Sequence, residues 1–320
     1  MGELAVAKPV IAGRSSLTLC LLLLIHAVSF IKTYSDSLPT VQEWTGDTMK
    51  FNAFVIMCIV VSGSIRAADE SKQSPEIKSL ILPGEAFLVE EQPAFILWPE
   101  SSLRKTPQPW VFYAPTLAGY PDSHEKWMHE HFLAAGIAVA GIDVGEAYGS
   151  PTSRKLFDAF YDQMTAKRGL AKKPCLLGRS RGGLWVSSWA CDHPERFSGL
   201  AGIYPVFDFR TYPGLDKAAP AFGLSPSDLE KQLEQFNPIA RMSVLATAKL
   251  PVFIIHGDED TVVPLKENSS EFALTYKKAN AEDAINLIVA KGQGHNFWEG
   301  FFKCQELVDF VIERAKAGAE

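Results

Sequence analysis

Short apolar runs alternate along the chain with longer segments in which apolar residues recur at helical spacing. Each run holds four to six residues, mostly aliphatic or aromatic, and leads into a turn, which is typical of a buried strand. The helical segments include residues 156–164, where an apolar stripe recurs every three to four positions. The runs that we interpret as strands are 86–90, 94–98, 110–113, 137–142, 174–177, 200–204, 251–255 and 284–289.

Strands that alternate with helical segments predict an α/β protein with a mainly parallel, eight-stranded sheet covered by helices on both faces. We expect the first two strands, which flank a turn at Pro93, to pair antiparallel at one edge. Ligands of such a sheet bind at the carboxyl ends of its strands. Helices are expected over residues 123–135, 184–190, 225–235 and 301–315.

Residues 178–183 read Gly-Arg-Ser-Arg-Gly-Gly and lie between a predicted strand and a predicted helix. A serine flanked by glycines in that context is a nucleophile elbow, where a tight turn exposes the hydroxyl. Side chains at Gly178 or Gly182 would collide with the neighbouring strand or helix. A turn serine without chemistry is the alternative for an isolated motif of this kind. The strand and helix around it favour Ser180 as a nucleophile.

A serine hydroxyl becomes a good nucleophile when a base takes its proton and an acid orients that base. The strand at 251–255 leads into an acidic turn with Asp258 and Asp260. The strand at 284–289 leads into a glycine-flanked loop that contains His295. Either aspartate could instead cap the following helix, and the histidine could be a surface residue. The order serine, acid, histidine, each after a strand, favours a catalytic triad.

On these motifs the chain resembles the α/β-hydrolase superfamily, and within it the prolyl oligopeptidase catalytic domain and the dienelactone hydrolase group. The matching motifs are GRSRGG at 178–183, HGDEDTVVP at 256–264 and GQGHNF at 292–297. The resemblance extends from about residue 85 to the end of the chain. It implies that the acid is Asp260, the last aspartate of the HGxxD pattern. Asp258 is the competitor, and Asp208 is a more distant alternative.

In this kind of fold, two backbone amides stabilise the oxyanion. The residue after the nucleophile supplies one donor, the Arg181 N–H. The loop after the strand at 110–113 supplies the other, which we assign to the Leu117 N–H, or to the Thr116 N–H if the register shifts by one. Pro115-Thr116 replaces the usual His-Gly in that loop, so both assignments stay open.

Residues near the elbow are candidates for a substrate pocket, namely Thr116, Tyr148 and Arg179. Tyr148 lies in the loop after the strand at 137–142, where it could line the pocket or only build the turn. Arg179 and Arg181 flank the serine and could attract an acidic substrate or pair with structural acids. We favour the structural pairing.

The segment at 207–249 separates the sixth and seventh strands. Hydrolases of this fold carry a cap over the pocket at this position, and the short length predicts a small lid. On the predicted helix at 123–135, His129 and His131 are two residues apart and do not share a face. Together with His124 they are expected to be solvated histidines and not metal ligands.

The first 84 residues resemble targeting sequence and linker. An apolar run at 51–61, preceded by Lys50 and followed by small residues, describes a secretory signal peptide that begins at Met49. Our interpretation assigns 1–48 to an upstream extension from a mis-set start, 49–68 to the signal peptide, 69–84 to a linker and 85–320 to the hydrolase domain. Alternatively, the apolar run at 17–31 is the working signal or a membrane anchor. The expectation is export to the periplasm or outside the cell, without a stable membrane partner after signal removal.

The composition suits one globular core, with 47% hydrophobic and 21% charged residues among 320. A net charge of −6 offers no basic footprint for nucleic acid. No glycine pattern for dinucleotides or phosphates and no CxxC pair occurs, so neither a cofactor nor a metal is expected. Cys175, Cys191 and Cys304, placed on a strand and two helices, are interpreted as buried small apolar residues.

Together these patterns predict a serine hydrolase that cleaves a small-molecule ester, or a similar acyl bond, through an acyl-enzyme. The closest alternative is a serine peptidase of the prolyl oligopeptidase kind that acts on short peptides. Against it, the residues before 85 leave no room for the β-propeller with which that group admits short peptides, and an amide has a worse leaving group than an ester. An alternative of another class is a non-catalytic binding protein with this fold, which typically lacks a triad member.

Overall fold

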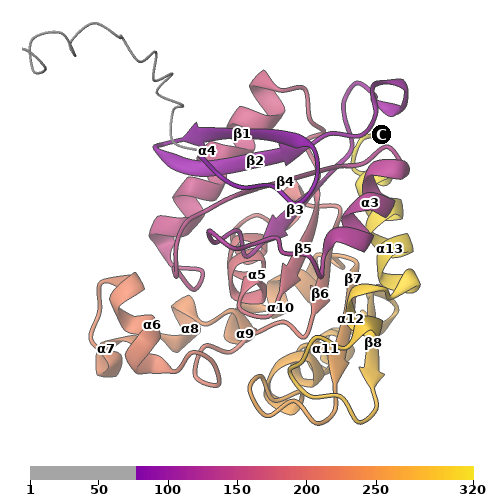
Figure 1. Cartoon of the computed structure of the whole chain (residues 1–320). Coiled ribbons are helices and arrows are strands. Elements are labelled where there is room, and N and C mark those ends of the chain that lie inside the picture. The colour runs from indigo at the N-terminus through magenta and orange to yellow at the C-terminus, as the bar shows by residue number, and fades with distance from the viewer. Residues whose placement is uncertain (1–76) are drawn as a thin grey trace, which may run out of the picture. The chain divides into compact units, whose positions relative to one another are not determined.

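The computed structural model of the protein describes residues 77–320 (Figure 1). The predicted upstream extension at 1–48, the signal peptide at 49–68 and the first half of the linker, 69–76, lie outside the described residues. Between residues 77 and 320, no helix is both long and apolar enough to cross a membrane.

One sheet of eight strands runs through the described part of the chain, as the apolar runs predict. Its strand order is β1-β2-β4-β3-β5-β6-β7-β8. The pairs β1–β2 and β2–β4 are antiparallel, and all pairs from β4 onward are parallel. The strands are β1 Gly84–Val89, β2 Gln92–Leu97, β3 Trp110–Ala114, β4 Ala138–Ile142, β5 Cys175–Arg179, β6 Gly199–Ile203, β7 Val252–Gly257 and β8 Ile285–Ala290.

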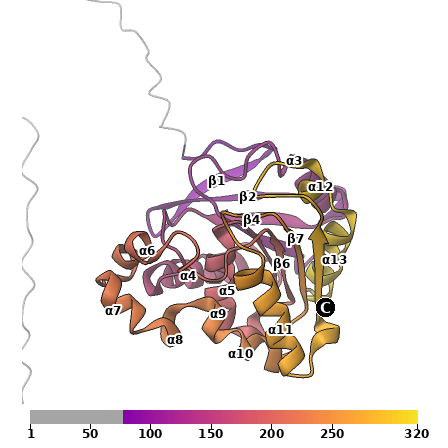
Figure 2. The same cartoon turned by 90° about the horizontal axis from the view of Figure 1, so that it is seen from below.

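Helices cover both faces of this sheet (Figures 1 and 2). Those on one face are α4 Pro151–Lys167, α5 Gly182–Asp192 and α11 Glu271–Lys278, and those on the other are α3 Lys126–Ala134, α12 Glu299–Phe302 and α13 Gln305–Ala317. The first core lies under α4, α5 and α11, and the second under α3, α12 and α13. Successive residues of a strand point to opposite faces, so Phe112 packs in the first core and Val111 in the second. Burial of both faces explains why the central strands are continuous apolar runs.

The segment at 207–249 forms five short helices that pack onto the domain. They are α6 Leu215–Phe222, α7 Pro226–Glu230, α8 Leu233–Phe236, α9 Pro238–Arg241 and α10 Ser243–Thr247. The single helix predicted at 225–235 is therefore divided, because Gln232 has φ −116° and ψ 22°, outside the helical region. Leu229 and Leu245 are fully buried in the same core as α5. This packing holds the segment against the sheet's first face.

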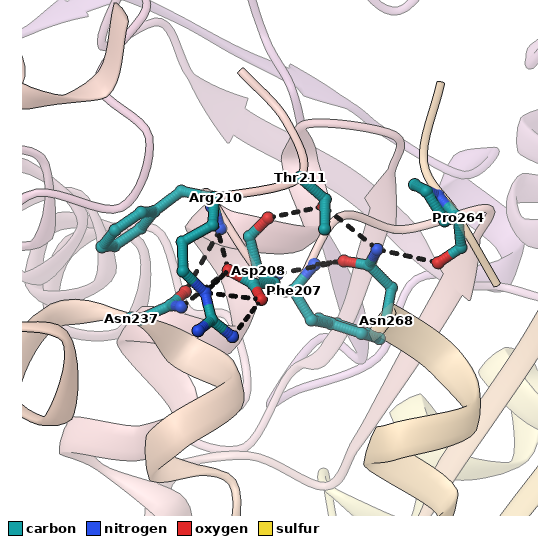
Figure 3. Close-up of polar contacts among 8 residues, drawn as sticks. Phe207, Asp208, Arg210, Thr211, Asn237, Pro264 and Asn268 are labelled. Carbon is teal, nitrogen blue, oxygen red and sulfur yellow. Dashed lines mark hydrogen bonds and ion pairs between the residues drawn. The ribbon is translucent and has the colours of Figure 1, made fainter. Parts of the chain in front are cut away.

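A buried polar network joins the start of this segment to the loop after β7 (Figure 3). The Asp208 carboxylate accepts hydrogen bonds from Asn237 Nδ2 at 2.8 Å and Arg210 Nη2 at 2.6 Å. The side-chain oxygen of Asn268, Oδ1, accepts from the backbone N–H groups of residues 207 and 208. Asn268 Nδ2 donates to the Pro264 carbonyl oxygen at 2.9 Å. The network thus connects the segment to the chain that follows Asp260.

The predicted C-terminal helix at 301–315 is also divided, into α12 and α13. Cys304 lies between them with extended backbone and not within a helix. The break lets Phe301 and Phe302 turn inward, and Phe301 packs edge-to-face on Tyr204 with ring centroids 4.9 Å apart. Cys175, Cys191 and Cys304 are all buried and free, as expected.

His129 of α3 differs from the prediction that His124, His129 and His131 are all solvated. The ring of His129 is fully buried, with its centroid 5.1 Å from that of Tyr113. Burial lowers the pKa of His129 to about 3. The prediction is wrong here because α3 lies flat on the sheet, so that position 129 shares the inward face with Met128 and Phe132.

Candidate active site

The elbow places Ser180 between the end of β5 and the start of α5. Its φ of 51° lies in the left-handed region, which a residue with a side chain adopts only when the surrounding structure holds it there. Here the Ser180 N–H donates to the Ile203 carbonyl at 2.9 Å, and the Ser180 carbonyl accepts from the Val206 N–H at 2.8 Å. A Cβ atom at Gly182 would collide with the Ala114 carbonyl. Tight contacts on both sides therefore fix the exposed turn.

The structure brings Ser180, His295 and Asp260 together from distant positions in the chain. Ser180 Oγ lies 2.8 Å from His295 Nε2. His295 Nδ1 lies 2.7 Å from Asp260 Oδ2. The three residues follow β5, β8 and β7, whose parallel arrangement places their carboxyl ends at one edge of the sheet. The distances correspond to a continuous hydrogen-bonded chain from hydroxyl to carboxylate.

Asp260 is buried and receives several hydrogen bonds. Its Oδ1 accepts from the backbone N–H groups of Val262 and Val263 at 3.0 and 2.8 Å. Burial by itself raises the pKa of Asp260, but hydrogen bonds from His256, His295 and the Val263 N–H outweigh it and hold the pKa well below its ordinary value. The carboxylate is therefore charged at neutral pH and can stabilise a protonated His295.

His256 is a residue of this site that the sequence analysis did not single out. It is fully buried, and its Nε2 lies 3.3 Å from Asp260 Oδ2 and 2.9 Å from the Val263 carbonyl oxygen. Because a carbonyl only accepts, Nε2 carries the proton, and Nδ1 accepts from the Ser269 hydroxyl at 2.7 Å. The i, i+4 spacing of His256 and Asp260 around one turn was the available signal.

Asp258 and Asp208, the alternatives to Asp260 as the acid, contact other residues. Asp258 is exposed and pairs with Lys291 Nζ at 3.1 Å and the Gly292 N–H at 2.7 Å. Asp208 belongs to the network of Figure 3, where it pairs with Arg210. Of the three aspartates considered, Asp260 makes the contact with His295.

The two assigned oxyanion donors lie on either side of the elbow. Arg181 is the residue before the first turn of α5, and Leu117 is half-buried in the loop after β3. Within residues 77–320 neither amide donates to another backbone carbonyl. The Leu117 carbonyl accepts from Lys78 Nζ at 2.9 Å and from the Tyr120 N–H at 2.8 Å, which stabilises the loop. The Thr116 side chain is turned away, since its hydroxyl donates to the Ile142 carbonyl.

A cavity of about 140 Å³ adjoins Ser180. Its lining residues are Pro115, Tyr120, Arg179, Ser180, Arg181, Tyr204, His295, Asn296 and Phe297. Of the three residues proposed from the sequence for a pocket, this lining includes Arg179. All lining residues come from outside the segment at 207–249, which the sequence suggested as a lid. That segment is instead held against the sheet by its apolar and polar contacts.

Tyr148 lies in a different environment. Its side chain packs with the first core, and its φ of 47° is left-handed. Burial, followed by the charge of nearby Glu146, raises the pKa of Tyr148 to about 12. Glu146 also forms an ion pair with Arg181. The loop after β4 is thereby tied to the residue that follows Ser180.

Arg179 is buried and compensated by two acids. Its Nη1 lies 3.0 Å from Asp122 Oδ2 and 2.5 Å from Glu125 Oε1. Its guanidinium also stacks over aromatic rings, 5.1 Å from the centroid of Tyr120 and 5.3 Å from that of Phe297. Both acids lie more than fifty positions earlier in the chain. The arginines that flank the serine therefore pair with structural acids, as we favoured.

No metal site accompanies these groups in the described chain. Within residues 77–320, no cluster of three or more histidine, cysteine, aspartate or glutamate side chains is arranged to hold a metal ion. The polar groups around Ser180 are instead paired with one another through hydrogen bonds and ion pairs. The arrangement can supply a nucleophile, a base and a charged acid in one line.

Residues 157–312 match the prolyl oligopeptidase family. No curated protein sequence matches the chain. The matched range contains the elbow, the acidic turn and the histidine loop. This match confirms the resemblance found in the three motifs.

Solved structures share the fold at low sequence identity. Dipeptidyl peptidase 4 of Porphyromonas gingivalis aligns with a TM-score of 0.56 at 18% identity over 72% of this chain and 35% of that one. MPT51 of Mycobacterium tuberculosis aligns with 0.57 at 14% identity, and Est1E of Butyrivibrio proteoclasticus with 0.55 at 17%, each over 72% of this chain and 98% of the other. This chain spans about a third of the length of the Porphyromonas peptidase. The α/β-hydrolase fold is thus confirmed, and the family match supports a serine hydrolase.

Proposed function

We propose that this α/β-hydrolase, which matches the prolyl oligopeptidase family over residues 157–312, cleaves an ester or similar acyl bond at Ser180. One observation carries the proposal, namely the hydrogen-bonded line from Ser180 Oγ through His295 to Asp260, with distances of 2.8 and 2.7 Å. A nucleophile, a base and an orienting acid in that geometry constitute the apparatus of acyl transfer.

In this proposal His295 Nε2 takes the proton of Ser180 Oγ as the oxygen bonds to the substrate carbonyl carbon. Asp260 holds the His295 Nδ1–H and stabilises the imidazolium that results. When the tetrahedral intermediate collapses, the bond to the leaving oxygen breaks, and His295 protonates that oxygen. A water then gives a proton to His295 and attacks the acyl-enzyme. The carboxylic acid leaves, and Ser180 regains its proton.

The oxyanion of each intermediate would accept hydrogen bonds from the Arg181 and Leu117 amides. The Arg181 N–H lies at the amino-terminal end of α5, where the helix dipole favours negative charge. One such donor is worth roughly 3 kcal/mol of transition-state stabilisation. Because both donors belong to the backbone, changes of side chain at 117 or 181 should act through the shape of the loop.

A neutral ester suits the charges around the cavity. The acids near it are each engaged by an arginine, with Asp122 and Glu125 on Arg179 and Glu146 on Arg181. A short peptide carries an ammonium group that would need a carboxylate partner. The family match and the dipeptidyl peptidase structure favour peptidase activity as a second candidate. An ester also has the better leaving group.

The test compares ester and anilide hydrolysis by the full chain with that of Ser180→Ala. Esters of p-nitrophenol with acetate, butyrate and octanoate are followed beside Gly-Pro and Ala-Pro nitroanilides. The proposal expects ester turnover that disappears in Ser180→Ala. Faster nitroanilide cleavage would move the assignment to a peptidase. Equal rates for the two proteins on every substrate would favour a non-catalytic binding protein.

A further inference from the structure

The cavity beside Ser180 has a definite place in the proposed reaction. Both Ser180 and His295 line it, so the scissile bond of a bound substrate lies within it, beside these two residues. His295 must deliver a proton to the leaving oxygen, and that oxygen has to lie within hydrogen-bonding reach of Nε2. Asn296 and Phe297, which follow His295 directly, continue the same wall. The group that occupies this side of the cavity is therefore attached to the leaving oxygen.

We infer that the cavity between Ser180 and Phe297 binds the alcohol portion of the substrate and takes one neutral group about the size of a single aromatic ring. This inference rests on the proposed hydrolysis at Ser180 and specifies its substrate class. The ligand is thus an ester of a benzyl-like or similar cyclic alcohol. Three properties of the cavity carry this assignment, which are its size, its walls and its charge.

The size of the cavity limits the occupant. Its volume is about 140 Å³. An apolar protein cavity of about 150 Å³ is known to accommodate benzene, so one six-membered ring fills a space of this kind. Two fused rings would leave little clearance in this volume. A small alkyl group leaves part of the cavity without contacts and loses their dispersion energy.

Three aromatic side chains, Tyr120, Tyr204 and Phe297, contribute to the wall beside its polar groups. Tyr204 is buried and packs on the imidazole of His295, with ring centroids 4.4 Å apart. Tyr120 is half-buried, and Phe297 at the mouth is 58% exposed. Such an exposed phenylalanine gains contacts when a ligand covers it. Aromatic walls favour a flat ring through offset or edge-to-face packing.

The charge of the cavity favours a neutral occupant. Arg179 reaches it from behind the nucleophile, but Asp122 and Glu125 compensate its guanidinium at 3.0 and 2.5 Å. Arg181 is engaged by Glu146. An anionic ring substituent would have to compete with these carboxylates. No gain from a negative charge on the alcohol is therefore expected.

The experiment uses the full chain and a series of acetates, so that the acyl group is constant. Benzyl, 2-naphthylmethyl, 4-carboxybenzyl and ethyl acetate are compared by kcat/KM. The alcohols are similar in acidity, and the differences report binding at the cavity. We expect benzyl acetate to exceed each of the others by about tenfold, the usual effect of a mismatch in an apolar pocket.

Two variants locate the effect. Phe297→Ala removes the outer wall and should bring 2-naphthylmethyl acetate to within about threefold of benzyl acetate, because a single removed contact of this kind changes discrimination severalfold. Trp298→Ala is the matched control, since Trp298 is the next residue, is also exposed and does not line the cavity. Trp298→Ala should leave the ratio of kcat/KM for benzyl acetate to that for 2-naphthylmethyl acetate unchanged.

Equal rates on benzyl and 2-naphthylmethyl acetate by the wild type would overturn the inference, as would faster hydrolysis of 4-carboxybenzyl acetate. So would a Phe297→Ala variant that alters only the preference among acyl chains of benzyl esters, because the cavity would then hold the acyl group. Labelling of Ser180 by a fluorophosphonate distinguishes a failure of this inference from a failure of the proposed function. A labelled protein without ring selectivity refutes this inference alone, whereas an unlabelled and inactive protein refutes the proposed function with it.

Discussion

His256 Nε2, at the end of β7, lies 3.3 Å from Asp260 Oδ2 in the turn that follows, and both side chains are fully buried. The same carboxylate oxygen contacts His295 Nδ1 at 2.7 Å. Asp260 therefore stands between two histidines, one directed to the nucleophile and one enclosed in the core. The inner histidine limits the orientations that the carboxylate can adopt.

Replacing His256 with alanine should weaken both stability and turnover. The Ser269 hydroxyl and the Val263 carbonyl would lose a buried partner, which costs about 1–3 kcal/mol in the free energy of unfolding. Loss of a fixed Asp260 orientation should lower kcat more than it raises KM. Urea unfolding and steady-state kinetics measure the two effects. Ser269→Ala, which removes only the partner of His256 Nδ1, should lower kcat far less; an equal loss would speak against orientation by His256.

Asp260→Asn should lower kcat by about 10⁴-fold, because an amide at this position favours the wrong tautomer of His295. Asp258→Asn is the matched control, two residues away and exposed, where it pairs with Lys291. It should retain most of the activity. Ester hydrolysis by the two purified variants at pH 7 decides between the acids. A greater loss in Asp258→Asn would transfer the acid's role to that residue.

His129→Phe should stabilise the protein, and more so at acidic pH. Neither ring nitrogen of His129 has a hydrogen-bond partner in the described part of the chain. The pKa of His129 is about 3 in the folded protein and near 6.5 in the unfolded chain. Between these pH values the unfolded chain binds a proton that the folded protein does not, so the free energy of unfolding falls as the pH falls through 6.5. At pH 5 this linkage costs about 2 kcal/mol relative to pH 8.

Denaturant unfolding of His129→Phe and the wild type at pH 8 and pH 5 measures this linkage. The increase in the free energy of unfolding of His129→Phe over the wild type should be larger at pH 5 than at pH 8. His131→Phe is the control, because His131 is half-buried and its Nδ1 contacts the Trp127 carbonyl. A gain for His129→Phe that is the same at both pH values would contradict a buried, neutral imidazole.

Arg179→Met should destabilise the fold by about 3–5 kcal/mol, because the buried Glu125 carboxyl keeps its hydrogen bonds from Tyr113 and Asp122 but loses its positively charged partner. Burial already raises the pKa of Glu125 above its ordinary value, and Arg179 opposes that rise. Glu125→Gln in the same chain should restore part of the loss. A double-mutant cycle in urea gives the coupling energy. Simple additivity of the two changes would show that the pair makes no such contribution.

The order of the three motifs and the strand before each of them were readable from the sequence. Continuous apolar runs identify strands buried on both faces, and a parallel sheet places their carboxyl ends at one edge. Ser180 and His295 could therefore be expected near each other across 115 positions. Gly178 could be anticipated as well, since a side chain there would meet the turn and helix that follow it, whereas Gly182 is crowded by Ala114 of the distant strand β3.

The tertiary structure decided the points that depend on side-chain direction. Asp258 and Asp260 differ by two positions, and only the path of the turn determines that Asp260 meets His295. The burial of His129 depends on how α3 lies on the sheet, and the compensation of Arg179 depends on acids more than fifty residues earlier. Local patterns specify elements and their order, because strand and helix periods are short-range properties. Contacts between distant elements arise from packing, which no local pattern encodes.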